Sequence, residues 1–198
     1  MDYGQASHYI KHEGIYLFGG VCGKSASQQE MNNDIFFFPI GANVVKKWKA
    51  LETKGQPPES RFHHSMHFYD KGNYLVVYGG RRFANPTPDI KYDSEFVNSI
   101  SVLRVDSLEW SLVKYKKDYC SYDSFPELFN FSSALIDDMI VVFGGMQGIY
   151  SQSKNCYSIS LPKAKTFYER PKTPDDQSEL EIGVEFSDSL EPHTKHQS

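Results

Sequence analysis

Residues 61–80 decide the fold, and they read RFHHSMHFYDKGNYLVVYGG. Two runs of aromatic and β-branched residues flank a turn at 70–73 that contains Asp, Gly and Asn. This pattern is typical of a β-hairpin. The second run ends at Gly79 and Gly80, and a glycine pair can adopt positive φ and let another backbone approach closely. The stretch therefore predicts a hairpin whose second strand ends at a point of close backbone contact.

The same strand ending occurs three times along the chain. The glycine pairs are Gly19 and Gly20, Gly79 and Gly80, and Gly144 and Gly145. Their ends lie 60 and 65 residues apart, and Trp48 and Trp110 keep the same phase at 62 residues. A further strand-like run lies between each glycine pair and the position of the tryptophan. The chain is therefore predicted to consist of three repeated units, each with four strands.

The junction before the second unit, residues 55–65, reads GQPPESRFHHS. It resembles the junction between blades in the kelch family, which has Gly, Pro, Arg and His-Ser there, and Gly79, Gly80 and Trp110 complete that pattern. The resemblance implies an all-β, kelch-type β-propeller, here partial or open, with three four-stranded antiparallel blades. It also implies that Arg61 and His64 are structural, because such polar side chains tie loops of adjacent blades together through backbone hydrogen bonds.

The resemblance covers about residues 3–170. The three blades are predicted at about 3–53, 60–116 and 127–170. The third departs from the pattern, since it has FPELFN at 125–130 where Arg and His are expected, and Phe167 or Tyr168 where Trp is expected. Propellers close with about four to eight blades. Three explanations stay open: a piece of a longer propeller, two copies that form a six-bladed ring, or exposed faces that the tail or a partner shields.

Residues 171–198 form a second region, with seven acidic residues against two lysines, and we expect it to be mostly disordered. Within it, residues 179–186 read ELEIGVEF and alternate polar with apolar side chains. One interpretation is a solvated linker. The other is a strand that adds to an exposed blade edge, in this chain or in a partner.

The bulk composition excludes several classes of protein. A net charge of −4 gives no reason to expect a nucleic acid or a membrane as partner. Cys22, Cys120 and Cys156 are odd in number and scattered, which suits neither a disulfide framework nor a zinc site, so reduced thiols are expected. No signal peptide or membrane-spanning run is found, which favours a cytoplasmic address, with the nucleus as the alternative.

The sequence contains no convincing candidate for a catalytic site or a metal site. His63, His64 and His67 form the densest titratable cluster, but no Cys or carboxylate lies at useful spacing beside them, so no metal and no cofactor are predicted. The glycine pairs lack the helix start and the Lys of a phosphate loop. The sequence offers no catalytic residues. Because some kelch-type propellers are metal-dependent enzymes, the resemblance leaves as an alternative an enzyme with its site at the channel mouth.

The loops that follow the second and fourth strands of each blade are expected on one face. The longest, which begins after Gly80, combines arginine with aromatic side chains, the residue types that dominate interface hot spots. We predict a non-enzymatic interaction scaffold of the kelch type that accepts an acidic or phosphorylated peptide. The alternative is an ordinary solvated loop whose aromatic side chains pack back on the blade. The predicted binding residues are Arg61, His63, Arg81, Arg82, Phe83 and Tyr92.

Overall fold

A computed structural model describes residues 3–23, 29–41, 46–83, 94–115, 127–147, 151–161 and 180–182. Every regular element in these ranges is a β-strand, which confirms the all-β prediction. Among these residues there is no helix long and apolar enough to span a membrane. The cysteines described, Cys22 and Cys156, are free thiols; Cys120 lies outside the described residues.

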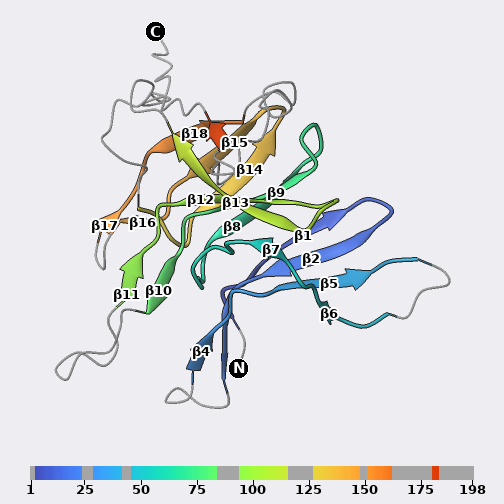
Figure 1. The fold of residues 1–198 in the computed structure, drawn as a ribbon. Coiled ribbons are helices and arrows are strands. Elements are labelled where there is room, and N and C mark those ends of the chain that lie inside the picture. Colours follow the sequence, from blue (N-terminus) through green and yellow to red (C-terminus); the bar gives the residue numbers. More distant parts are fainter. Residues whose placement is uncertain are drawn as a thin grey trace, which may run out of the picture.

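Three blades follow one another along the chain (Figure 1). The first pairs its strands in the order β1-β2-β5-β6, the second in the order β8-β9-β12-β13, and the third in the order β14-β15-β18, with neighbouring strands antiparallel. The strands are β1 (Ala6–Ile10), β2 (Gly14–Phe18), β5 (Ile35–Pro39), β6 (Lys49–Ala50), β8 (Ser65–Tyr69), β9 (Tyr74–Tyr78), β12 (Ile100–Arg104), β13 (Glu109–Tyr115), β14 (Ser132–Ile136), β15 (Met139–Phe143) and β18 (Cys156–Ser160).

The antiparallel pairing of consecutive strands in each blade is confirmed, while the fourth strand predicted for the third blade lies outside the described residues. The first strands of the second and third blades begin later than the sequence pattern predicts, which is from Phe62 and Phe129. The first strand of the second blade begins at Ser65, because His63 adopts a left-handed φ of 56° that ends any strand from Phe62. Asn130 has the same conformation ahead of the third blade. The Phe167 or Tyr168 expected in the fourth strand of the third blade lies outside the described residues.

Each glycine pair leads into a small hairpin that projects from its blade (Figure 1). These hairpins consist of β3 (Val21–Gly23) with β4 (Gln29–Met31), β10 (Arg81–Phe83) with β11 (Ser94–Phe96), and β16 (Met146–Gln147) with β17 (Ser151–Gln152). From the sequence, these segments were expected to be loops. They begin as paired strands because the glycines, with φ between 67° and 95°, turn the chain sharply at the end of the second strand.

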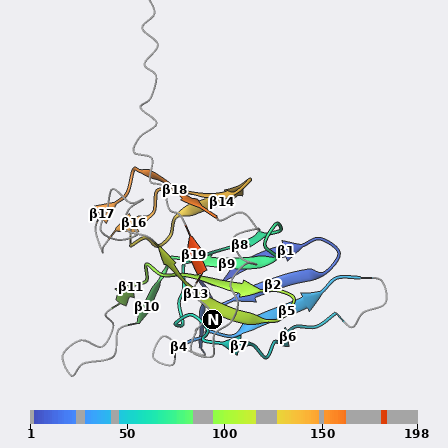
Figure 2. The same ribbon diagram turned by 45° about the horizontal axis from the view of Figure 1, so that its top comes forward.

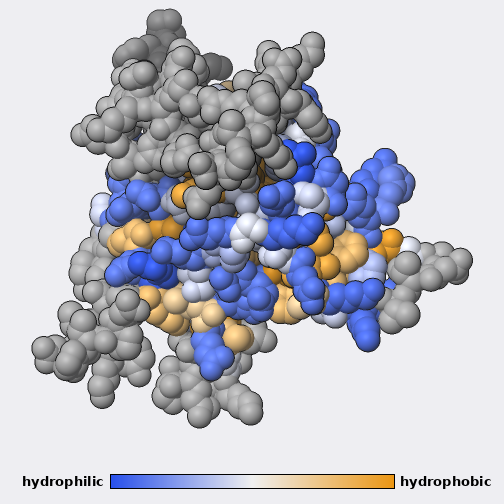
Figure 3. All heavy atoms as spheres, viewed as in Figure 1, coloured by the Kyte–Doolittle hydropathy of each residue, from blue (hydrophilic) through white to orange (hydrophobic). Residues whose placement is uncertain are grey.

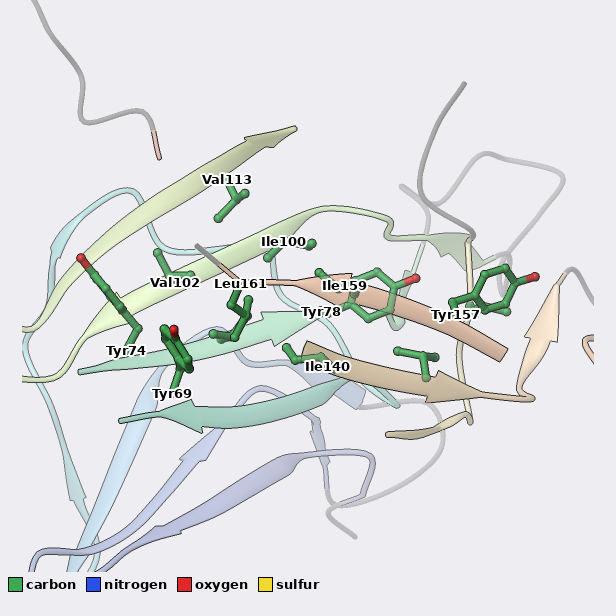
Figure 4. Packing of buried hydrophobic residues seen from close by; sticks show 13 residues of the cluster. Tyr69, Tyr74, Tyr78, Ile100, Val102, Val113, Ile140, Tyr157, Ile159 and Leu161 are labelled. Carbon is green, nitrogen blue, oxygen red and sulfur yellow. The ribbon is translucent and has the colours of Figure 1, made fainter. Parts of the chain in front are cut away.

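The second blade is packed on both sides. One core fills the space between the first and second blades and includes Phe18, Leu75 and Trp110, and the other lies between the second and third blades. In the second core Tyr78 and Ile100 meet Ile140, Tyr157 and their neighbours across the gap (Figure 4). All five residues of β9 are buried, as expected for a strand covered on both faces.

Two short strands cover the outer edge of the second blade. β7 (Lys54–Gly55) pairs in parallel with the start of β13, at Glu109 and Trp110. β19 (Leu180–Ile182) pairs in parallel with its end, at 113–115 (Figure 2). Of the two interpretations of 179–186, the structure thus supports the strand that adds to a blade edge, over three residues. Both strands satisfy backbone groups of β13 that would otherwise be unpaired.

Candidate functional site

The three projecting hairpins define what we call the hairpin face. On it, the segment before each blade forms a β-bridge with the first residue after the glycine pair: Tyr3 with Val21, Phe62 with Arg81, and Phe129 with Met146. This contact confirms that the loops after the second strands and the junctions between blades share one face. In the space-filling view, hydrophobic residues gather low on the described surface, where Figure 1 places β4 and β10 (Figure 3).

Arg81 occupies the centre of the hairpin face. Its guanidinium carbon lies 4.9 Å from the ring centroid of Phe62 and 4.5 Å from that of Phe129. Each of these cation–π contacts contributes about 0.5–2 kcal/mol, depending on how dry the site is. The two phenylalanines are buried, whereas Arg81 keeps part of its surface exposed. Phe62 comes from the second blade and Phe129 from the third, so Arg81 spans the junction between two blades.

The charge of Arg81 has no carboxylate partner within the described ranges, and its buried Nε makes no hydrogen bond there. Arg82 is different. Its Nη2 lies 2.6 Å from the Glu95 carboxylate and its Nη1 lies 3.0 Å from that of Glu59. Of Arg81 and Arg82, only Arg81 thus retains a positive charge that no described carboxylate neutralises.

His63 lies beside the Arg81 cluster, as predicted. Its ring centroid is 5.2 Å from that of Phe62 and 6.0 Å from that of Tyr3. Burial, together with the nearby charge of Arg81, holds the pKa of His63 below its ordinary value. The imidazole is therefore neutral at pH 7 and acts as an aromatic surface.

Arg61 is buried and is not exposed on the hairpin face. Its side chain is fully buried, which argues against the prediction that it contacts a partner. Its Nη2 donates to Ser99 Oγ at 3.0 Å, and its Nη1 donates to the carbonyls of Ser99 and Gly79 at 3.3 and 3.4 Å. Its Nε donates to the carbonyl of Glu59 at 3.1 Å. Arg61 thus ties the junction to the loops of its own blade, a structural role.

The remaining predicted residue that the structure describes, Phe83, belongs to the same surface: its ring lies 5.2 Å from Phe62. Tyr92 lies outside the described residues. Tyr3 and Phe129 also belong to this surface, and they were not predicted. Both are repeat equivalents of Phe62, so aligning the residues that precede each blade would have found them.

His64 and His67 are structural. His64 packs edge-on against Phe18 of the first blade at 5.4 Å, and His67 shares a 2.8 Å hydrogen bond with Ser133 of the third blade. Burial lowers the pKa of His64 to about 3 and that of His67 to about 4. In the described part of the chain, no three His, Cys, Asp or Glu side chains converge as a metal would require.

A hollow of about 550 Å³ lies at the other end of β1, β8 and β14, the first strands of the three blades. Among the described residues that line it are Lys11, Lys71 and Asp137, and none is a His, Cys or Ser. Lys71 is paired at 2.6 Å with Asp138, which also accepts a hydrogen bond from Tyr69 at 2.9 Å. These pairs stabilise the turns at this end of the blades.

Comparison with known proteins agrees with this architecture. Over 154 and 155 residues the chain is 23% and 24% identical to the human and rat forms of "Multiple epidermal growth factor-like domains protein 8". These matches cover 78% of the chain but only 5% of the relatives' length. The solved structure of YjhT superimposes with a TM-score of 0.57 at 13% identity, over 80% of this chain and 48% of that one, which shows a shared fold.

The family match covers most of the chain. Residues 4–179 match the family described as the KLHDC2/KLHL20/DRC7 Kelch-repeats domain. All three glycine pairs and both tryptophans lie within the matched residues. The chain belongs to the kelch-repeat family.

Proposed function

We propose that this chain is a non-enzymatic interaction module that binds an acidic or phosphorylated segment of another protein on its hairpin face. One observation carries the proposal: Arg81 is held between Phe62 and Phe129 and lacks a carboxylate partner among the described residues. A guanidinium with free donors binds carboxylate or phosphate oxygens strongly. Arginine next to aromatic rings is also the usual composition of an interface hot spot.

The surroundings of Arg81 favour an anion that arrives from outside. Arg82 is already paired with two carboxylates, and His63 is neutral at pH 7. The electrostatic attraction for an anionic peptide is therefore centred on Arg81. The two phenylalanine rings hold the guanidinium in place, which reduces the entropy lost on binding. The hairpins project from rigid blades, where binding loops commonly lie.

The test compares two neighbouring arginines on an array of acidic, phosphorylated, neutral and basic peptides. Arg81→Ala should weaken the binding of acidic or phosphorylated peptides by at least tenfold, because it removes the central charge. Arg82→Ala is the matched control and should change binding less than threefold, because its charge is already paired. The proposal fails if no acidic peptide binds the parent protein, or if both variants lose binding equally.

We also propose that two copies of the chain associate to complete a propeller. Both end blades expose large apolar side chains, among them Tyr9 and Trp48 on the first and Ile136 and Phe143 on the third. Exposed apolar faces of this kind mark association surfaces.

A further inference from the structure

The residue before each glycine pair is covered in the first two blades and exposed in the third. The residue before each glycine pair is Phe18, Tyr78 or Phe143. Phe18 and Tyr78 are 0% and 1% exposed, whereas Phe143 is 60% exposed. Their places in the blades are equivalent, because each ends the second strand and pairs with the start of the third: Ile35, Ile100 or Cys156.

In the first two blades, the following blade covers this residue. Phe18 packs against Trp110 at 5.3 Å, and Tyr78 packs against Phe131 at 5.5 Å. Backbone hydrogen bonds link the same pairs of blades, because Gly20 N donates to the carbonyl of Arg61 and Gly80 N to that of Leu128. Each of these bonds runs from one blade to the next.

The third glycine pair has room for a further blade, which the described residues do not supply. A Cβ placed on Gly19 or Gly79 would come within 2.7 or 3.0 Å of a carbonyl oxygen that precedes the next blade. On Gly144 the nearest atom would be 3.8 Å away. Within the described ranges, Gly145 N has no counterpart of the bond that Gly20 and Gly80 make. Phe143 and this glycine pair thus form half of a blade-to-blade contact.

The first blade has the complementary half. Trp110 of the second blade stands opposite Leu103 and is 2% exposed, because the first blade covers it. Trp48 is the equivalent residue of the first blade, and it packs on Phe38, the equivalent of Leu103, at 5.3 Å. Trp48 is nevertheless 47% exposed. Nothing among the described residues covers it as Phe18 covers Trp110.

We infer that the outer face of the third blade packs on the outer face of the first blade of a second copy, so that Phe143 contacts Trp48 of the partner subunit. This inference rests on the self-association proposed above. Each copy has one exposed Phe143 on its third blade and one exposed Trp48 on its first blade. Two copies therefore form two identical contacts and close a ring of six blades, within the range of about four to eight that propellers use. Each copy covers 48% of YjhT, whose fold it shares, so two supply a whole.

The first test measures solution mass by light scattering after gel filtration. The 22.7 kDa chain should elute at twice that mass. Phe143→Lys and Trp48→Glu should each reduce the mass to that of one chain, because both contacts in the ring lose an apolar partner. Both positions are exposed, so neither change should prevent folding. Leu112→Lys, at another exposed apolar position (53%), is the matched control and should leave the dimer intact.

Mixing the two monomeric variants tests the pairing itself. A mixed dimer has one contact between native residues and one between the introduced lysine and the introduced glutamate, so the two-chain mass should return. A parent protein with the mass of one chain, or with a mass that grows beyond two, overturns the proposed self-association and this inference. A dimer that survives either single variant, or a mixture that stays monomeric, overturns the Phe143–Trp48 contact and leaves self-association standing.

Discussion

Arg61→Ala should lower the free energy of unfolding by about 3 kcal/mol. The side chain is fully buried and donates hydrogen bonds to Ser99, Gly79 and Glu59. Without the guanidinium, these buried and part-buried acceptors lose their donor, at about 1–3 kcal/mol for each that water cannot reach. Urea unfolding monitored by circular dichroism measures the change.

Two other arginine variants sharpen this prediction. Arg61→Lys should recover little of the loss, because an ammonium lacks the planar fork that reaches several acceptors at once. Arg82→Ala should cost less than about 1 kcal/mol, because Arg82 makes exposed ion pairs with Glu59 and Glu95. Equal losses for Arg61→Ala and Arg82→Ala would contradict the structural role of Arg61.

Acid should destabilise the protein well above the pH at which carboxylates titrate. Burial lowers the pKa of His64 to about 3 and that of His67 to about 4, while in the unfolded chain both titrate near 6.5. Below pH 6.5 the unfolded chain therefore binds more protons than the folded one, and stability falls as pH falls towards 4. Between pH 7 and pH 5 each histidine should remove about 2 kcal/mol.

Variants identify the groups responsible. His67→Gln can keep a hydrogen bond to Ser133 and should remove about half of the loss that His64 and His67 cause together between pH 7 and pH 5. His12→Asn, at an exposed turn with positive φ, should behave as the parent protein does. Urea unfolding at both pH values gives the comparison. Equal stability of the parent protein at pH 5 and pH 7 would refute the assignment.

Much of the fold could be predicted from the sequence, because its signals are local. The glycine pairs and the turn at 70–73 specify strand ends, and the spacing of Trp48 and Trp110 shows the repeat. Family resemblance then provides the architecture. The hairpins after the glycine pairs were missed, because their second strands lie beyond variable insertions and carry no apolar alternation.

The candidate site depends on distant pairings, so it was predicted only in part. That Arg82 is neutralised follows from its register opposite Glu95 across β10 and β11. The burial of Arg61 depends on the loop around Ser99, 38 residues away. Conversely, the residue type of Arg81 and its neighbours in the sequence indicated a binding role, whereas the two phenylalanines that hold it come from different blades.

The most direct test of the account is an amide chemical-shift titration of the isotope-labelled protein with the acidic or phosphorylated peptide that binds best. We expect the shifts to cluster on the hairpin face, at Tyr3, Arg81, Phe83 and Phe96, and Arg81→Ala to abolish them. Shifts that cluster at the opposite end instead, around Lys11, Lys71 and Asp137, would contradict it.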